Sequence, residues 1–451
     1  MRRITLEKGQ IFDESLLQRT GAFDADALIA ATRIVEDVRT RGDEALRELT
    51  AELDGVDLAE FRVSQEAVNA ALGEADPKLT RALELAADQI RDFHERQRQQ
   101  GWFTVRQDGA LTGMKVTPLD SVGIYVPGGR ALYPSSVLMN AIPASVAGVE
   151  RIVCVTPPRA DGTLDPGIVD ACRIAGVTEI YSIGGAQAVA ALAYGTQSIP
   201  KVDKITGPGN AYVAAAKKVV SGDVGIDMIA GPSEVCVVAD ETAVPDLVAV
   251  DLMAQAEHDP LAACYLVTFS EAYADQVEAS IARQAAASTR TEITTTSLRD
   301  KGLVVVCQDL AQAMQTVNVI APEHLELHLP DALDLLGLVR HAGAIFLGEW
   351  TPEAVGDYMA GPNHTLPTGG TARFANPLSL DEFVKKSSVI RYSPAALLND
   401  ADTVTAIADH EGLWSHARSV RLRKQLLTQG YISDESLDAV PAAEQVDKDR
   451  A

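Results

Sequence analysis

The chain has 451 residues, of which 47 % are apolar and 23 % are charged. This composition excludes collagen-like, coiled-coil and wholly disordered proteins, and the length suits about two to four globular domains. The 63 acidic side chains outnumber the 39 basic ones, which gives a net charge of −24. Because an acidic chain is repelled by phosphate backbones and anionic lipids, we expect no nucleic-acid partner and no membrane partner.

The start of the sequence and the cysteines both indicate the cytoplasm. Residues 1–5 include two arginines, but a polar segment follows them, so no signal peptide is expected. No run of about 18 apolar residues predicts a membrane span. The five cysteines are widely spaced and lack a CxxC pair, which argues against a disulfide framework or a thiolate metal cluster.

Residues 1–120 have a mostly helical pattern, with apolar side chains recurring in steps of three and four over 79–93. After residue 120, short apolar runs alternate with helical segments. The predicted strands cover 122–126, 152–155, 235–239, 265–269, 303–307 and 344–347. The predicted helices cover 165–175, 187–194, 211–220, 244–258 and 272–287. This alternation indicates βαβ units around mainly parallel sheets, and residues 380–431 return to a helical pattern.

Glycine and proline gather in four turns, which cover 126–130, 183–187, 206–210 and 230–234. At such turns, backbone N–H groups can closely approach a phosphate or a dinucleotide. None of the four matches GxGxxG, and a single turn of this kind is usually structural. Four turns at the expected carboxyl edge of a sheet leave open both a cofactor crevice and a purely structural role.

Histidines with nearby carboxylates suggest a metal or acid–base site. Gln255 and His258 are three residues apart, so they share one face of a helix. Residues 322–326 predict a turn in which carboxylates surround an imidazole, and 356–364 and 411–416 supply further histidines. Imidazole nitrogens and carboxylate oxygens suit Zn²⁺ or a related divalent ion, although no HExxH motif is present. The remaining histidines are expected to be structural or solvent-exposed: His94, His328, His341 and His410.

The cysteines offer no nucleophile. Four lie in apolar strand runs and one in a helix, and none adjoins a histidine or a polar glycine turn. A lowered thiol pKa is therefore not expected. GxSxG and Walker-type motifs are also absent from the sequence.

Seven segments together resemble the histidinol dehydrogenase family and occur in the family's order. They are 122–129 (VGIYVPGG), 207–213 (GPGNAYV), 230–234 (AGPSE), 255–259 (QAEHD), 322–326 (PEHLE), 356–368 (GDYMAGPNHTLPT) and 411–416 (EGLWSH). The resemblance implies an NAD-dependent, four-electron oxidation of L-histidinol to L-histidine through L-histidinal, the last steps of histidine biosynthesis. It also implies one Zn²⁺ per subunit and a homodimer.

The resemblance further implies roles for individual residues. His324 would act as general base and Glu323 would activate water. The zinc ligands would be Gln255, His258, Asp357 and His416. The substrate would contact Ser233, Gln255, His258, His324, Asp357, His364, Glu411 and His416. NAD would contact Tyr125, Gln187 and Asn210.

The expected fold class is α/β, with two Rossmann-like parallel-sheet domains plus small helical N- and C-terminal segments. We expect an N-terminal segment at 1–20 and a discontinuous first α/β domain made of 21–121 and 237–378. The second α/β domain, which binds NAD, would cover 122–236. Residues 379–431 would form a helical domain that is exchanged in the dimer. Residues 432–451 carry six acidic and two basic side chains, which predicts a disordered acidic tail.

Two other functions fit parts of the sequence. The first is a relative of the family that oxidises another polar alcohol, for instance a sulfonated diol. Glu411 and His416 argue against it because they match the histidinol-type motif. The second is a zinc-binding α/β protein without redox activity, such as a hydrolase or a ligand-binding module. NADH absorbance separates this protein from a dehydrogenase.

Overall fold

The computed structural model describes residues 1–17, 19, 25–128 and 132–431. The predicted acidic tail at 432–451 and the end of the first glycine turn, 129–130, lie outside these residues. The chain forms two compact units. The first contains Met1–Arg98 and Pro118–Val384, and the second contains Gln99–Thr117 and Lys385–Ala451. In the described part, no helix is long and apolar enough to cross a membrane.

The first unit contains a five-stranded parallel sheet in the order β6-β5-β4-β7-β8. Its strands are β4 (Ser121–Tyr125), β5 (Arg151–Thr156), β6 (Glu179–Ser182), β7 (Lys204–Thr206) and β8 (Gly225–Ile226). The connecting helices are α5 (Pro134–Ala147), α6 (Pro166–Ala175), α7 (Gly185–Tyr194) and α8 (Ala211–Val220). The strand order reverses between β4 and β7, which is the switch point where ligands bind in doubly wound sheets.

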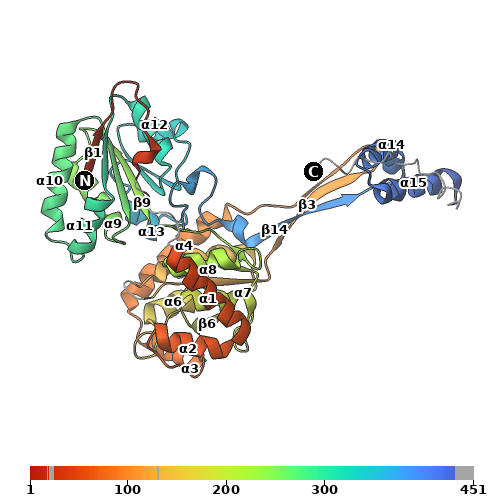
Figure 1. Ribbon diagram of the computed structural model, residues 1–451, viewed down its shortest axis with the longest axis horizontal. Helices are drawn as coiled ribbons and strands as arrows, with labels where there is room; N and C mark the ends of the chain where they lie inside the picture. Colours follow the sequence, from red (N-terminus) through yellow and green to blue (C-terminus); the bar gives the residue numbers. More distant parts are fainter. Residues whose placement is uncertain (18, 20–24, 129–131, 432–451) are drawn as a thin grey trace. The chain divides into compact units, whose positions relative to one another are not determined.

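The same unit contains a six-stranded parallel sheet in the order β1-β11-β10-β9-β12-β13. Figure 1 labels two of its strands, β1 and β9. Its strands are β1 (Arg2–Thr5), β9 (Glu234–Ala239), β10 (Ala263–Thr268), β11 (Leu303–Val306), β12 (His324–His328) and β13 (Ala344–Leu347). Its helices are α9 (Pro245–Ala256), α10 (Glu271–Ala285), α11 (Thr291–Asp300), α12 (Leu310–Ile320) and α13 (Glu353–Tyr358). Without β1, the strand order repeats that of the first sheet, so the predicted pair of Rossmann-like parallel sheets is confirmed.

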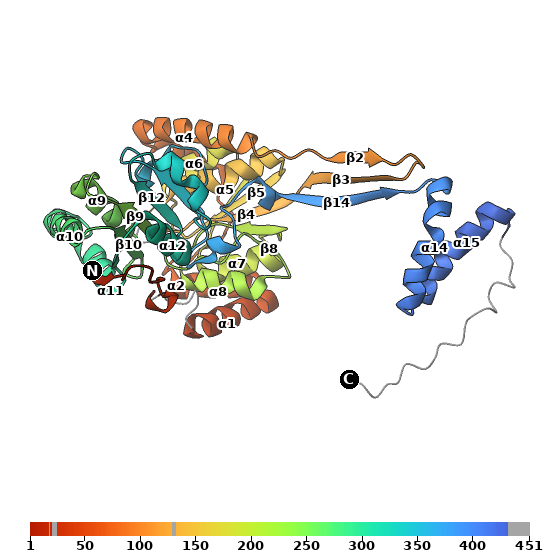
Figure 2. The same ribbon diagram turned by 90° about the horizontal axis from the view of Figure 1, so that it is seen from above.

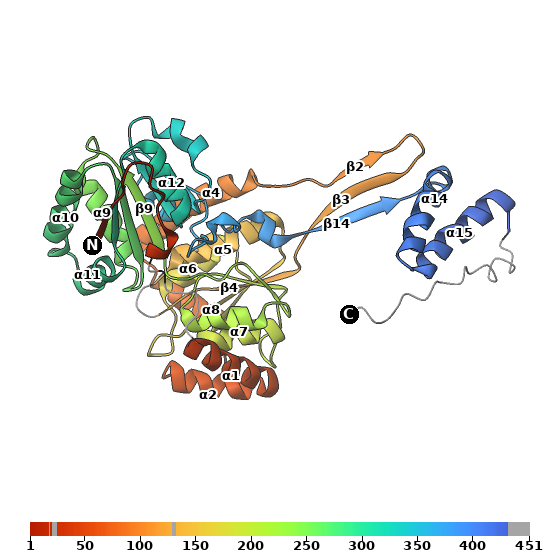
Figure 3. The same cartoon turned by 45° about the horizontal axis from the view of Figure 1, so that its top comes forward.

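Helices cover both faces of each sheet (Figure 3). Helices α9, α10 and α11 pack on one face of the six-stranded sheet, and α12 packs on the other. Val235 and Val237 therefore point to one core, and Cys236 and Val238 point to the other. Because both faces are buried, these strands are continuous apolar runs that are easy to predict. Four short 3-10 helices complete the described unit: Glu14–Leu16, Ala332–Leu338, Thr371–Arg373 and Leu380–Phe383.

The N-terminal helices pack on the five-stranded sheet. They are α1 (Ala25–Arg41), α2 (Asp43–Leu53) and α4 (Pro77–Glu95), whereas α3 (Gln65–Gly73) packs on α6. Val35 and Leu46 join the core on one face of this sheet, and Leu83 and Ile90 join the core on the other face. The packing therefore differs from the expected grouping of 21–121 with 237–378. The expected boundary after residue 236 also falls within β9, whose apolar side chains belong to the six-stranded sheet.

The second unit combines strands with a helical hairpin (Figure 2). Strand β2 (Trp102–Val105) is antiparallel to β3 (Leu111–Pro118), and β14 (Val384–Arg391) lies on the other side of β3. Helices α14 (Pro394–His410) and α15 (Trp414–Gln429) pack on each other. The helical C-terminal segment is confirmed by α14 and α15. The helical pattern predicted over 99–117 and 384–391 is wrong, because β2, β3 and β14 occupy these residues.

Candidate active site

Glu323 and His324 lie at the amino end of β12, beside the start of β9. The Nδ1–H of His324 donates to the backbone oxygen of Glu234 over 3.1 Å. The backbone N–H of Glu234 donates to Glu323 Oε2 over 2.8 Å. One peptide segment therefore positions both predicted catalytic side chains. Residues 324–328 form a central strand, so the prediction of a turn at 322–326 is wrong beyond its first two residues.

In the neutral ring, the proton that Nδ1 donates to Glu234 leaves the Nε2 atom of His324 without one. Nε2 is buried and has no hydrogen-bond partner among the described residues. It lies 3.9 Å from a carboxylate oxygen of Glu353 and 3.9 Å from one of Asp357. Burial lowers the pKa of His324 and raises that of Glu323 well above its usual value. The lowered pKa favours the neutral imidazole of His324, whose open nitrogen can accept a proton.

A cluster of metal-binding side chains lies on the Nε2 side of His324. Suitable ligand atoms of His258, Glu353 and Asp357 all lie within 4.8 Å of one another. Gln255, near the end of α9, directs its amide at Glu353. With its nitrogen toward Glu353, the amide donates to the two carboxylate oxygens over 2.5 and 3.1 Å. With its oxygen in that place, the two groups would repel each other unless a cation lay between them. The residues present therefore fit a divalent cation.

The other predicted site residues fall into two groups. In the first unit, Ser233 directly precedes β9, and the Nδ1–H of His364 donates to the backbone oxygen of Asp357 over 3.1 Å. Glu411 caps the end of α14 and His416 lies in the first turn of α15, so both belong to the second unit. Their part in the site stays a prediction. Sequence reasoning missed Glu353, although its carboxylate lies one helical turn before Asp357.

The predicted NAD contacts lie at the carboxyl edge of the five-stranded sheet. Tyr125 ends β4, Gln187 lies in the first turn of α7, and Asn210 caps α8. The Tyr125 hydroxyl accepts the N–H of Gly185 over 3.0 Å, and burial raises its pKa to about 12. Tyr125 and Asn210 flank the switch point between β4 and β7, where helix N-termini favour bound phosphates. Gln187 is instead buried, and its amide donates to Asp54 over 3.4 Å.

The glycine turns are divided between two sheet edges. The turns at 183–187 and 206–210 lie at the carboxyl edge of the five-stranded sheet, as expected. The turn at 230–234 instead leads into the amino end of β9, so the expectation of four turns at one carboxyl edge is wrong. Gly207 has a φ of +112°, and a Cβ atom there would lie 2.2 Å from the backbone oxygen of Tyr125. Only glycine fits at this position.

A buried ion pair holds the turn at Gly207. The ammonium group of Lys217 donates to the Gly207 backbone oxygen over 3.0 Å and pairs with the carboxylate of Asp227. Asp227 Oδ2 in turn accepts the N–H of Gly207 over 2.8 Å. Both backbone polar groups of Gly207, its N–H and its carbonyl oxygen, are therefore held by this ion pair.

All five cysteines are free and buried. Burial raises the pKa of the Cys236 and Cys264 thiols, which disfavours their thiolates. This agrees with the prediction that no thiol acts as nucleophile.

Comparisons with known proteins agree with the motifs. Residues 17–424 match the family model for histidinol dehydrogenase. Histidinol dehydrogenases from Halalkalibacterium halodurans and Bacillus subtilis are 52 % and 53 % identical, over 87 % and 88 % of this chain and 93 % of each relative. A crystal structure of histidinol dehydrogenase from Elizabethkingia anophelis superposes with a TM-score of 0.90 at 34 % identity, covering 95 % of this chain and 98 % of that one. This chain belongs to the histidinol dehydrogenase family.

Proposed function

We propose that this chain oxidises L-histidinol to L-histidine through L-histidinal, with two NAD⁺ reduced in turn. Family membership supports the substrate and the reaction class. The observation that carries the mechanism is the open Nε2 of buried His324, which faces the His258, Glu353 and Asp357 cluster. NADH absorbance after addition of L-histidinol and NAD⁺ tests the proposal.

The first oxidation requires a base for the hydroxyl proton. As a hydride leaves the carbinol carbon, His324 Nε2 receives the proton of the hydroxyl group. The Glu234 carbonyl, which holds Nδ1–H, keeps the ring in the required tautomer and orientation. A positioned base of this kind contributes about 10²–10⁴-fold to the rate.

The second oxidation requires water to add to the aldehyde. Glu323 would take a proton from this water as its oxygen attacks the carbonyl carbon. The product is the anion of the hydrate, which loses the second hydride and becomes the carboxylic acid. Burial raises the pKa of Glu323, so its ionised carboxylate is a stronger base than usual. The route needs no covalent thiol intermediate, in agreement with the buried cysteines.

Zn²⁺ is the cation that we propose for the cluster. Gln255, His258 and Asp357 would hold it, and His416 would complete the set, with Glu353 beside it. When bound, Zn²⁺ supplies a fixed positive charge that binds and orients the substrate. Ser233, His364 and Glu411 would contact the substrate, and Tyr125, Gln187 and Asn210 would contact NAD.

We also propose a cytoplasmic homodimer. Glu411 and His416 belong to the helical hairpin of the second unit, whereas the other predicted site residues belong to the first. An exchange of 379–431 between subunits would bring these residues to the partner's active site.

Removing the metal should abolish NADH formation, because the substrate would lose the charge that orients it. Dialysis against a chelator, followed by metal analysis, prepares the test protein, and added Zn²⁺ should restore turnover. An Asp357→Asn variant should bind less zinc, whereas His341→Asn, which lies outside the cluster, should retain it. Full activity in protein verified as metal-free would contradict the proposal.

A further inference from the structure

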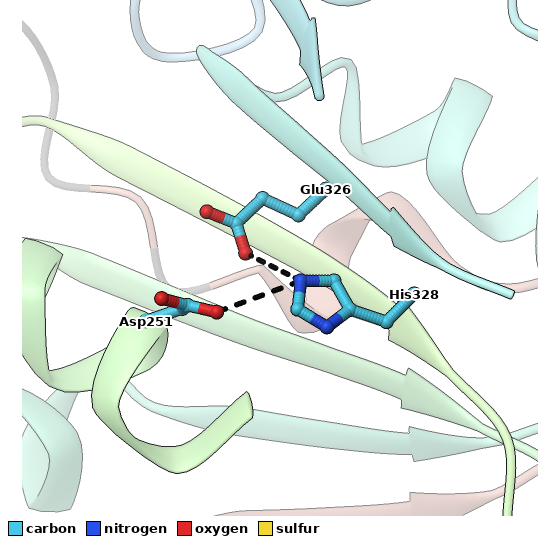
Figure 4. Close-up of side chains that lie close together, drawn as sticks. All are labelled: Asp251, Glu326 and His328. Atoms are coloured by element: carbon cyan, nitrogen blue, oxygen red, sulfur yellow. Dashed lines mark hydrogen bonds and ion pairs between the residues drawn. The ribbon is translucent and has the colours of Figure 1, made fainter. Parts of the chain in front are cut away.

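Three buried side chains form a network beside the cluster of His258, Glu353 and Asp357. Figure 4 shows Asp251, Glu326 and His328 directed at one another. Glu326 and His328 lie on β12 and alternate with leucines, so they share a face of the strand with His324. Asp251 projects from α9, and all three side chains are at least 90 % buried.

The polar contacts of this network join the strand to both neighbouring helices. The Nε2–H of His328 donates to Glu326 Oε2 over 3.1 Å and lies 3.5 Å from Asp251 Oδ2. The other carboxylate oxygen of Glu326 accepts the backbone N–H of Glu353 over 2.9 Å. Both carboxylates lie close to the His328 Nε2–H, and the buried Nδ1 atom of His328 has no hydrogen-bond partner among the described residues. Because the Nε2–H already lies between the carboxylates, we assign no second metal ion to the network.

The network connects the two helices that carry the metal ligands. Asp251 lies one turn before Gln255 on α9, and His258 follows the end of this helix. Glu353 begins α13, which also carries Asp357. Glu326 therefore holds the start of α13, and the contact between His328 and Asp251 holds α9. Both helices are therefore held against β12, the strand that begins with His324.

We infer that Asp251, Glu326 and His328 are positioning residues that set the spacing of the metal ligands on α9 and α13. The inference rests on the proposed metal site and extends it. Residues that orient metal ligands typically change metal affinity by about 10–100-fold when they are altered. Glu326 must reach both His328 and the Glu353 N–H, so the length of its side chain matters as well as its charge.

Two substitutions of Glu326 separate the effect of its side-chain length from the effect of its charge. Glu326→Asp keeps the charge but shortens the side chain by one methylene group. Glu326→Gln keeps the length, but its amide cannot accept from His328 and from the Glu353 N–H together. We expect both variants to bind Zn²⁺ about 10–100-fold more weakly than the wild type. Affinity is measured on metal-free full-length protein by competition with a chromophoric chelator.

A matched control addresses general loss of stability. Asp170 is another buried carboxylate, which pairs with Arg173 and accepts from Thr80 beside the five-stranded sheet. Asp170→Asn should bind Zn²⁺ like the wild type. In the Co²⁺-loaded proteins, the visible absorption spectrum should change for Glu326→Asp but not for Asp170→Asn, because only the former alters the ligand geometry.

Each outcome decides a different point. Failure of the wild type to bind Zn²⁺ would overturn the metal site and this inference together. Wild-type affinity and spectrum in a folded Glu326→Asp would overturn the inference alone, as would an equal loss in Asp170→Asn. If the Glu326 variants do not fold, Asp251→Asn serves as the test, because it weakens only the contact between α9 and His328. A several-fold weaker affinity in this variant supports the inference, and wild-type affinity overturns it.

Discussion

Glu323→Gln should slow the oxidation of histidinal far more than the oxidation of histidinol. The substitution keeps the size of the side chain and can still accept the N–H of Glu234, but it removes the base that activates water. Because a positioned base contributes about 10²–10⁴-fold, the loss in the aldehyde step should lie in that range. Single-turnover NADH formation from each substrate, with metal content checked, measures the two steps separately.

His324→Asn provides the comparison for this prediction. The alcohol step begins with proton removal at Nε2, so this variant should slow the oxidation of histidinol. His341→Asn, a histidine outside the site, should leave both rates unchanged. Small and equal effects of Glu323→Gln and His324→Asn on the two substrates would show that this pair is not catalytic.

Lys217→Met should cost about 3–5 kcal/mol of the free energy of unfolding. Both members of its ion pair are almost completely buried, and the variant leaves Asp227 as a buried charge without its cation. Denaturant unfolding measures the loss. The exposed Lys201→Met is the matched control, and a surface substitution of this kind should stay within about 0.5 kcal/mol.

A double variant tests the cause of that loss. Lys217→Met combined with Asp227→Asn removes the unpaired charge and should recover part of the stability. Because the pair holds the Gly207 turn beside Tyr125 and Asn210, the KM for NAD⁺ should also rise in Lys217→Met. A loss in Lys217→Met no larger than that in Lys201→Met would contradict this view of the pair.

The sequence predicts the strands whose side chains are apolar on both faces. Residues 235–239 are an example, because parallel strands buried on both sides need no polar partner. Strand β12 escapes this rule, since His324, Glu326 and His328 alternate with leucines. Their burial depends on partners from α9, α13 and the backbone of Glu234, which are distant in sequence. A local sequence pattern cannot show these partners, so the sequence predicts a turn at 322–326 where the structure has a strand.

The motifs identify residues that share a short segment better than residues that act from a distance. Gln255 and His258 are recognisable because they are one helical turn apart. Glu234 enters the site only through tertiary contacts with Glu323 and His324. Glu353 lies one turn before Asp357, but its contact with Gln255 of another helix is not visible in the sequence. The apolar stripe of α4 likewise predicts a buried face, but not that the face packs on the five-stranded sheet.

The ratio of NADH formed to L-histidinol consumed tests the central proposal most directly. Purified, zinc-loaded protein is incubated with limiting L-histidinol and excess NAD⁺, and the products are quantified by chromatography. The proposed four-electron oxidation predicts two NADH and one L-histidine for each L-histidinol, and one NADH for each L-histidinal. No NADH, or one NADH with L-histidinal as the final product, would contradict it.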